Sequence, residues 1–468
     1  MPLPDGFRFG VATSGFQIEG GYNGPGQPAN NWRDWERSGR AAEPAGAALD
    51  FWNRYEDVLD RAVAAGCQAF RLSVEWARCE PSPGHYDEEA FARYRAILDA
   101  CHARDMEPVV TLHHFTHPAW LGPDLWLDLR SPDRFAAWAA AAAERLGDRC
   151  RNWFTINEVN AVAFQTYFTA ALPPGRLGRT GDVVRALAHL LAGHVLAYRA
   201  IHRRQPDAVV STNNHALSVY ELDPLLIDLL LGRSHGVERA DLRDWLAERR
   251  HRYHGGLPAP SRLERAQRTV AASILRFDQP FARAVTELYQ GPDERPIDVI
   301  LLNYYDPVTA NRVWLPGRRT VGGRNWSPFR QLTDSAVNPE GLTRYCRLNH
   351  EPGLEMWLAE NGLCNRVRSS VTYGRRDGWD RARYLRANLA AVEAAVQEGL
   401  PVTRYFHWTL ADSYEWGTYE HRFGLYRVDQ MDGAPVWSDV DAFGGDAAGA
   451  YRRLAESLRR AQPLPVAP

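Results

Sequence analysis

Short apolar runs alternate with helical stretches along this chain, and this alternation constrains the fold more than any other feature of the sequence. Eight short runs have the apolar, β-favouring composition of buried strands. They are residues 9–18, 69–74, 108–113, 152–156, 208–213, 297–303, 354–359 and 402–408. Helical spacing of apolar residues follows most of these runs, at residues 51–66, 87–104, 132–146, 182–204, 341–350, 380–399 and 447–460. The pattern predicts a parallel sheet covered by helices.

Eight strand–helix units in one chain predict an α/β fold, the (β/α)8 TIM barrel. The chain has 468 residues, against roughly 250 for a bare barrel, so we expect long βα loops and a deep pocket. Residues 214–296 are the least clear part, with predicted helices at residues 240–252 and 263–275. Because no linker or repeat divides the sequence, we expect residues 1–468 to form a single barrel domain.

Composition argues against several classes of function. The formal net charge is −2 and no basic stripe stands out, so neither nucleic acid nor an anionic membrane is an expected partner. All 55 basic residues are arginine, which excludes Schiff-base chemistry and a P-loop lysine. We find no signal peptide in residues 1–10 and no run of the roughly 20 apolar residues that span a membrane. Six cysteines without Cys-x-x-Cys spacing complete the expectation of a cytoplasmic protein.

Two of the apolar runs end in a glutamate. Asn157 and Glu158 close the run that begins at Trp153, and Glu360 closes the run that begins at Leu354. The carboxyl ends of barrel strands meet at one face, where active sites lie. Cleavage of a glycosidic bond needs one carboxyl group to donate a proton and another to attack the sugar. The pair therefore indicates glycoside chemistry, against the alternative of two unrelated surface acids.

Three histidines close together in the sequence raise the alternative of a metal site. His113 and His114 are consecutive on a predicted strand, so their side chains point to opposite faces and cannot share one ion without distortion. His117 follows in a loop, ahead of a proline. We expect no metal and no cofactor, and we favour His114 as a sugar ligand.

Seven motifs stand at the ends of predicted strands in a fixed order. They are Phe-Gly-Val-Ala-Thr-Ser-Gly-Phe-Gln-Ile-Glu-Gly at 9–20, Arg-Leu-Ser-Val-Glu-Trp at 71–76, Thr-Leu-His-His-Phe at 111–115, Thr-Ile-Asn-Glu at 155–158, Asn-Tyr-Tyr at 303–305, Glu-Asn-Gly at 360–362, and Trp at 408 with Glu-Trp at 415–416 and Arg-Phe-Gly at 422–424. From residue 9 to about residue 429 the chain resembles glycoside hydrolase family 1, the family of β-glucosidases and related β-glycosidases.

The resemblance implies a role for each of these motifs. Glu158 would be the acid/base and Glu360 the nucleophile of a retaining mechanism, with Arg71 and Tyr305 beside the nucleophile. Asn157 would hold the sugar 2-hydroxyl, a contact that strengthens in the transition state. The other implied sugar-binding residues are Gln17, His114, Asn303, Trp408, Glu415 and Trp416.

The roles set electrostatic expectations. Glu360 must be ionised to attack, and Arg71 would favour its charged form. Glu158 must be protonated, and we expect the charge of Glu360 to raise its pKa, to about 6. In a retaining enzyme the two carboxyl groups lie roughly 5–5.5 Å apart, and the nucleophile forms a covalent glycosyl-enzyme.

Glu415 and Trp416 bear on the sugar that is accepted. The branch of the family that cleaves 6-phosphosugars replaces this pair with a phosphate-binding set that includes a lysine, so the resemblance implies an unphosphorylated sugar. Thioglucosidases of the family carry glutamine in place of the acid, so Glu158 implies O-glycosides. The sequence also leaves open simpler roles: a turn cap for Gln17, a loop ion pair for Glu415, and core packing for Trp408 and Trp416.

Departures from the family pattern fall where the leaving group would bind. Val159 replaces a proline common after the acid/base, Ser335 replaces a common tryptophan, residues 416–422 are one residue shorter, and residues 214–296 match poorly. We therefore expect a retaining β-glycosidase with β-glucosides as the foremost substrates and an undefined aglycone. A transglycosidase or natural-product β-glycosidase on the same site, and a non-catalytic glycoside-binding protein, are the alternatives. The sequence defines neither the oligomeric state nor the choice among glucose, galactose, fucose and mannose.

Overall fold

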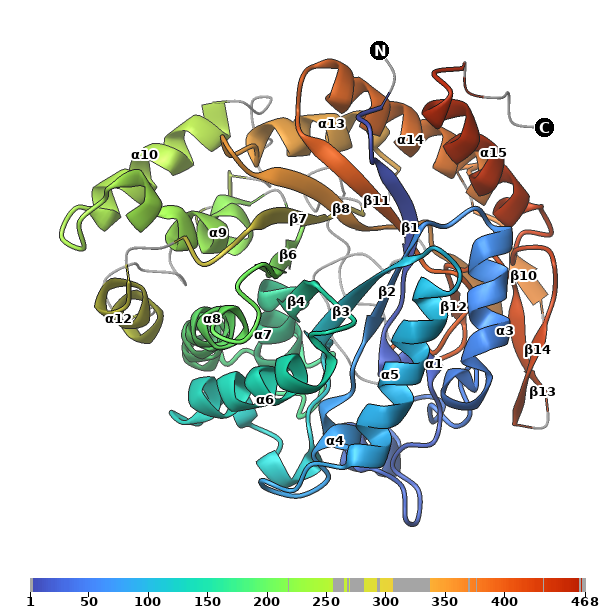
Figure 1. Ribbon diagram of the computed structural model, residues 1–468, viewed down its shortest axis with the longest axis horizontal. Coiled ribbons are helices and arrows are strands. Elements are labelled where there is room, and N and C mark those ends of the chain that lie inside the picture. The colour runs from blue at the N-terminus through green and yellow to red at the C-terminus, as the bar shows by residue number, and fades with distance from the viewer. Residues whose placement is uncertain are drawn as a thin grey trace.

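A parallel β-barrel lies at the centre of the computed structural model, and helices surround it (Figure 1). The structure describes residues 3–217, 219–255, 282–292, 295–305, 337–368, 371–375, 377–431 and 433–462, together with residues 265, 266, 269 and 464. Long segments separate several barrel strands from the next covering helix, for example residues 13–50 and 409–446, as the length of the sequence predicted. The predicted (β/α)8 fold is confirmed.

The barrel strands of the described residues all run parallel. They are β1 (Arg8–Ala12), β2 (Ala69–Ser73), β3 (Glu107–His113), β4 (Asn152–Ile156), β5 (Val209–Ser211), β6 (Asn213–His215), β7 (Val299–Asn303), β8 (Glu355–Asn361) and β11 (Val402–Trp408). Their order in the sheet is β5-β4-β3-β2-β1-β11-β8-β7-β6. Only Thr212 separates β5, which pairs with β4, from β6, which pairs with β7. This divided strand therefore closes the barrel.

Each of the eight predicted runs contains a barrel strand, but the predicted bounds of two runs were wrong. The first strand ends at Ala12, and residues 15–18 form the short helix α1 (Gly15–Ile18) instead. The chain turns there because Gly15 N–H donates to Ser73 Oγ at 2.5 Å and Phe16 N–H donates to Glu75 Oε1 at 3.2 Å. The fifth run divides at Thr212, whose hydroxyl donates to a carbonyl of β4 at 2.7 Å.

Helices cover the outside of the barrel in the order expected from the sequence (Figure 1). The predicted ones are α3 (Phe51–Ala64), α5 (Glu88–His102), α6 (Ser131–Leu146), α8 (Thr180–His202), α10 (Leu242–Gly255), α13 (Pro339–Leu348), α14 (Arg381–Gln397) and α15 (Ala447–Arg459). Those not predicted include α2 (Arg33–Arg37), α4 (Trp76–Cys79), α7 (Val159–Tyr167), α9 (Pro224–Leu231) and α12 (Ala282–Gln290). The predicted helix at 263–275 lies outside the described residues except at positions 265, 266 and 269.

Two small antiparallel sheets flank the barrel, and the sequence did not predict them. One joins β9 (Asn365–Arg368), β10 (Val371–Tyr373) and β12 (His421–Arg422), which come from the loops after β8 and β11. The other is the hairpin of β13 (Val428–Met431) and β14 (Ala434–Trp437). Their strands are short, so the alternation of apolar and polar residues is too brief to stand out in the sequence.

Apolar side chains fill both the inside and the outside of the barrel. The interior cluster consists of Ala12, Ala69, Val109, Phe154, Val299, Leu301, Trp357, Ala359, Cys364, Phe406, Trp408 and Phe423. A larger cluster packs the outer faces of the strands against the helices. In it, Trp138 of α6 stacks on Trp76 with ring centroids 5.9 Å apart and an interplanar angle of 5°, and its indole N–H donates to the Leu112 carbonyl at 3.1 Å.

Strand register brings the polar strand ends to one end of the barrel. Ala12 pairs with both Arg71 and Trp408, and Asn303 pairs with both His215 and Glu360. Because all these strands are parallel, the residues that follow them emerge at the same rim, where barrel enzymes carry their active sites.

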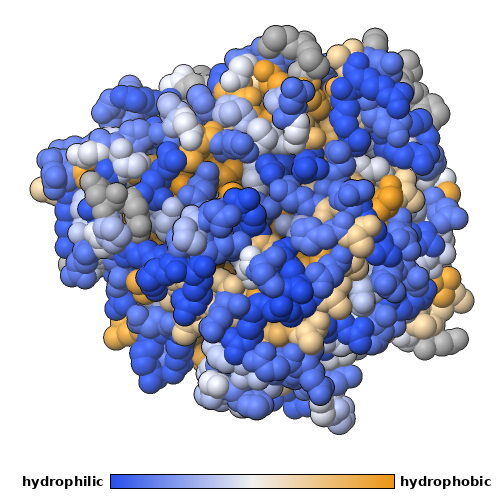
Figure 2. Space-filling model, viewed as in Figure 1, coloured by the Kyte–Doolittle hydropathy of each residue, from blue (hydrophilic) through white to orange (hydrophobic). Residues whose placement is uncertain are grey.

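The outer surface is polar on the face shown in Figure 2, where hydrophilic side chains predominate. Within the described ranges, no helix combines the length and the apolar character needed to cross a bilayer.

Replacing Trp138 by alanine should lower the free energy of unfolding by about 3–5 kcal/mol, because the change leaves a cavity against Trp76 and removes a buried hydrogen bond. Urea unfolding followed by fluorescence would measure the loss. Leu129→Ala is the matched control: that side chain is 72% exposed, so the change should stay within about 0.5 kcal/mol. Equal effects of the two substitutions would contradict the stacking role of Trp138.

Candidate active site

Glu158 stands at the junction between β4 and α7, in an unusual backbone conformation. Its φ of 50° and ψ of 63° fall in the left-handed region, which is costly for a residue with a side chain. Its backbone N–H donates to Asn213 Oδ1 at 3.0 Å, which helps to hold the turn. The residue is 6% exposed. The strand-to-helix junction therefore fixes a buried carboxyl group at the rim of the barrel.

Among the described residues, two side chains contact the Glu158 carboxyl group, and both contacts fall on Oε1. Asn303 Nδ2 donates to it at 2.9 Å, and His215 Nδ1 lies 2.9 Å from it. Asn303 ends β7 and His215 ends β6, so neighbouring strands supply the two partners. His215 was not among the residues predicted from the sequence.

Glu360 lies across the rim on β8 and is 3% exposed. Arg71 Nη1 donates to its Oε1 at 2.6 Å, and the Tyr305 hydroxyl donates to its Oε2 at 2.8 Å. Arg71 Nη2 also donates to Asn157 Oδ1 at 2.7 Å. One buried guanidinium thus joins the end of β8 to the end of β4.

Amide side chains complete the connection between the two carboxyl groups. Asn303 Nδ2, which binds Glu158, also lies 3.3 Å from Asn157 Oδ1. Because Asn157 Oδ1 accepts from Arg71 as well, a continuous chain of hydrogen bonds runs from Glu158 to Glu360. The chain fixes the position of each carboxyl group relative to the other.

The electrostatics of this pair differ from the sequence expectation. Burial raises the pKa of Glu360 to about 7, and the nearby Glu158 charge adds to it, while Arg71 and Tyr305 oppose it. Burial also acts to raise the pKa of Glu158, but His215, and after it Asn303 and Arg71, bring that pKa below its ordinary value. The expected rise for Glu158 was wrong because the contact with His215 could not be read from the sequence.

A second group of polar and aromatic side chains lies beside the carboxyl groups. Gln17 Nε2 donates to the Tyr414 carbonyl at 2.8 Å, and Trp408 Nε1 donates to Glu415 Oε1 at 3.1 Å. Burial raises the pKa of Glu415 to about 8, against the hydrogen bond from Trp408, and so favours a protonated carboxyl group at neutral pH. The group thus combines a carboxyl, an amide and an indole in one buried place.

His114 connects this second group to the carboxylate pair. Its ring lies 5.5 Å from that of Trp408 and 5.8 Å from that of Trp416, and its Nε2 lies 3.2 Å from Asn157 Nδ2. Burial brings its pKa well below the ordinary value, so the ring is neutral. Asn157 Oδ1 already accepts from Arg71, so Nδ2 is the donor, Nε2 of His114 accepts, and Nδ1 carries the hydrogen.

Three buried polar atoms of these side chains have no hydrogen-bond partner among the described residues: Gln17 Oε1, His114 Nδ1 and Asn303 Oδ1. They provide two acceptors and one donor. Buried polar groups in proteins are nearly always paired, so such atoms call for an explanation. A ligand that both donates and accepts hydrogen bonds, as a polyhydroxylated sugar does, would satisfy all three.

The other two histidines of the sequence cluster point elsewhere. His113 Nε2 accepts from Trp126 Nε1 at 3.3 Å, and His117 Nε2 lies 3.0 Å from the Gly122 carbonyl. Within the described part of the chain, no three His, Cys, Asp or Glu side chains are grouped so that they could hold a metal ion.

The structure brings the eleven residues singled out from the sequence to one rim of the barrel. Reasoning from the sequence missed Asn213 and His215, which hold the backbone and the carboxyl group of Glu158. A signal was present, because Asn213, Asn214 and His215 form a polar cluster directly after an apolar strand. The last two of these residues open the segment 214–296, which resembled the family least.

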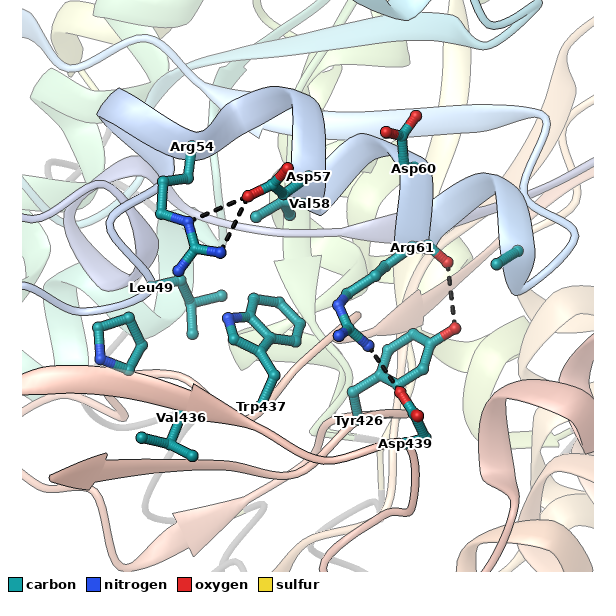
Figure 3. Close-up of a pocket in the computed structure, with 12 residues that line it drawn as sticks. Leu49, Arg54, Asp57, Val58, Asp60, Arg61, Tyr426, Val436, Trp437 and Asp439 are labelled. Atoms are coloured by element: carbon teal, nitrogen blue, oxygen red, sulfur yellow. Dashed lines mark hydrogen bonds and ion pairs between the residues drawn. The ribbon is translucent and has the colours of Figure 1, made fainter.

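A separate surface cavity of about 730 Å³ lies between α3 and the β13–β14 hairpin (Figure 3). None of the predicted site residues lines it. Its charged side chains pair with one another: Arg54 with Asp57 at 2.9 Å and Arg61 with Asp439 at 3.0 Å. The Arg61 guanidinium also covers the Trp437 ring, 4.8 Å from its centroid. The cavity is therefore distinct from the rim that holds Glu158 and Glu360.

Comparisons with known proteins show the family of the chain. The model of glycosyl hydrolase family 1 matches residues 1–436. A bifunctional β-D-glucosidase/β-D-fucosidase of Bifidobacterium breve is 30% identical, over 92% of this chain and 94% of the relative. Beta-glucosidase 6 of Oryza sativa subsp. japonica is 28% identical, over 92% of this chain and 87% of the relative. A β-galactosidase of Sulfolobus acidocaldarius is 25% identical, over 93% of each chain.

Solved structures share the fold. A β-glucosidase from Thermotoga maritima in complex with noeuromycin gives a TM-score of 0.73 at 22% identity, with 98% of this chain and 99% of the other covered. The same enzyme in complex with galacto-hydroximolactam gives a TM-score of 0.73 at 23% identity. With its barrel, its paired carboxyl groups and a family match over nearly its whole length, the chain belongs to glycosyl hydrolase family 1.

Proposed function

We propose that this glycoside hydrolase is a retaining β-glycosidase that cleaves the O-glycosidic bond of unphosphorylated β-glycosides, foremost β-glucosides. The observation that carries the proposal is the hydrogen-bonded path from Glu158 through Asn303, Asn157 and Arg71 to Glu360. It holds two buried carboxyl groups at the ends of two separate strands, β4 and β8, on one rim, and double displacement requires such a pair. The similarity to a β-glucosidase, a β-galactosidase and a bifunctional β-D-glucosidase/β-D-fucosidase supports a β-linked hexose.

In the first step, Glu360 attacks the anomeric carbon while Glu158 protonates the departing oxygen. Arg71 and Tyr305 hold the nucleophile through separate oxygens, so its attacking orbital is aimed without rotation of the carboxylate. Positive charge develops on the sugar in the transition state and stabilises the ionised form of Glu360. The one proton of the carboxyl pair is then on Glu158. The C–O bond to the aglycone breaks as the glycosyl-enzyme forms.

In the second step, water replaces the aglycone. Glu158, now a carboxylate, accepts a proton from water as the water attacks the anomeric carbon and releases Glu360. Two inversions at that carbon return the β configuration. The same two carboxyl groups therefore serve both halves of the reaction, and no cofactor takes part in the proposed mechanism.

The sugar itself would be held by the group around His114. Gln17 Oε1, His114 Nδ1 and Asn303 Oδ1 offer hydrogen bonds to hydroxyl groups, and Glu415, with its raised pKa, can both donate and accept. Trp416 supplies an apolar ring beside His114. With no lysine in the chain to bind a 6-phosphate, an unphosphorylated sugar is the proposed substrate.

We further propose that residues 1–468 form one catalytic domain and that the protein is cytoplasmic. All six cysteines lie within the described residues, each is buried, and none forms a disulfide. Unpaired thiols persist in a reducing compartment, which supports this location.

The direct test is release of nitrophenol from a panel of aryl β-glycosides, with the anomer of the product followed by NMR. Hydrolysis of the β-glucoside with β-glucose appearing first is the expected result. Products coupled to an added alcohol in preference to water would identify a transglycosidase instead. Initial appearance of α-glucose would overturn the retaining mechanism, and binding without turnover would indicate a non-catalytic protein.

Glu360→Ala should lower kcat by about 10⁴–10⁶-fold, because the covalent step is lost. Sodium azide should partly restore turnover and yield an α-glycosyl azide, since azide then attacks from the face that Glu360 occupied. Glu355→Ala, at the exposed start of the same strand, is the matched control and should keep activity within about twofold. Full activity in Glu360→Ala would contradict the assignment of Glu360 as the nucleophile.

Glu158→Ala should distinguish substrates by their leaving groups. A dinitrophenyl glycoside needs no proton for departure, so its first step should be spared, whereas alkyl glycosides should lose about 10²–10⁴-fold in kcat/KM. Azide should then give a β-glycosyl azide, because it attacks the glycosyl-enzyme. The measurement is kcat/KM of Glu158→Ala and of the unaltered protein over a series of glycosides that differ in the aglycone. A uniform loss over the series would show that Glu158 is not the proton donor.

A further inference from the structure

His215 touches both halves of the catalytic pair. Its Nδ1 lies 2.9 Å from Glu158 Oε1, and its ring stacks on Tyr305 with centroids 5.5 Å apart and an interplanar angle of 23°. Tyr305 in turn donates to Glu360 Oε2 at 2.8 Å. The family comparison and the motifs of the sequence assign no role to this residue.

The backbone around His215 fixes the direction of its ring. The His215 N–H donates to Asn160 Oδ1 at 2.8 Å, and its carbonyl accepts from Asn160 Nδ2 at 2.9 Å. Asn160 lies in the first turn of α7, the helix that begins directly after Glu158. The histidine and the acid/base are thus tied to each other through both side chain and backbone, and their separation does not depend on a loop.

We propose that His215 is a positioning residue for the acid/base, which holds Glu158 by Oε1 and makes it a stronger proton donor in the first step. This inference rests on the proposed function. Within the described residues, both contacts of the Glu158 carboxyl group fall on Oε1, from His215 and Asn303. Oε2 is therefore the oxygen that carries the proton to the departing aglycone, while the C–O bond breaks.

Charged groups on several elements determine the protonation state of the His215 imidazole. Burial acts to lower the pKa of His215, but Glu158 before α7, Asp223 before α9 and Glu360 on β8 together raise it. Arg71 of β2 is the permanent cation of the site and lies on the far side of Asn157. The carboxylates around His215 thus favour the imidazolium form.

An imidazolium beside Glu158 has opposite effects on the two steps. It stabilises the carboxylate that remains after the proton has left, so protonation of the aglycone oxygen becomes easier. The same stabilisation weakens Glu158 as the base that deprotonates water. The contact should therefore favour substrates with poor leaving groups, for which the first step limits the rate.

Two substitutions of His215 separate its hydrogen bond to Glu158 from the stacking of its ring on Tyr305. His215→Asn keeps an N–H donor near the position of Nδ1 but removes the titrating ring, and His215→Phe keeps the ring against Tyr305 but removes the donor. His202→Gln is the matched control, because His202 Nε2 lies 2.9 Å from Asp298, a histidine–carboxylate pair at the opposite end of the barrel. All three proteins are compared as full-length chains, with circular dichroism as the check on folding.

The pH profile of kcat/KM supplies the decisive measurement. Loss of the imidazolium removes the main group that lowers the pKa of Glu158, so burial then raises this pKa against Asn303 and Arg71 alone. The alkaline limb should therefore move upward by about one pH unit in both His215 variants and stay in place in His202→Gln. On alkyl glycosides kcat/KM should fall by about tenfold, and on dinitrophenyl glycosides it should change by less than about twofold.

An unchanged alkaline limb, or equal losses on both classes of substrate, would overturn the role of His215. Should His215→Phe fail to fold, His215→Asn alone carries the test. Failure of the proposed function is seen separately, because the unaltered protein would then hydrolyse no member of the glycoside panel.

Discussion

The Arg71 guanidinium is the interaction on which the rest of the site depends. It is fully buried inside the barrel, where an unpaired charge would cost several kcal/mol. Each of its nitrogens has a partner: Nε donates to Thr111 Oγ1, Nη1 to Glu360 and the Ala359 carbonyl, and Nη2 to Asn157. Its planar face lies 4.5 Å from the Phe154 ring centroid. The Arg71 guanidinium thus binds residues on or next to three other strands, β3, β4 and β8.

This arrangement explains why the two carboxyl groups differ. Glu360 forms an ion pair with the permanently charged Arg71. Among the described residues, the Glu158 carboxyl group is contacted only by neutral or titratable side chains, those of Asn303 and His215. A fixed cation suits a group that must be an anion before it attacks. A titratable partner suits a group that must gain and lose a proton in one turnover. The difference in roles therefore follows from which strand ends lie beside each glutamate.

Much of this could be predicted from the sequence, for a physical reason. A barrel strand must be apolar along its body, so the polar residue at its carboxyl end stands out, as Glu158 and Glu360 do. The features that escaped prediction depend on contacts between distant segments. The division of the fifth strand at Thr212 and the contact of His215 with Glu158 both follow from which strands become neighbours on closure of the barrel.

Stability and reactivity make opposite demands at the rim of the barrel. The left-handed backbone of Glu158 costs free energy in the folded protein. So do Gln17 Oε1 and His114 Nδ1, which have no hydrogen-bond partner in the part of the chain that the structure describes. In a loosely packed protein, the backbone and these side chains would shift to relieve the strain and to find hydrogen-bond partners. Here the interior cluster and the hydrogen bonds of Arg71 lie directly beneath, so the side chains stay where a sugar would meet them. The apolar barrel interior is thus what allows a polar, strained and reactive surface to persist above it.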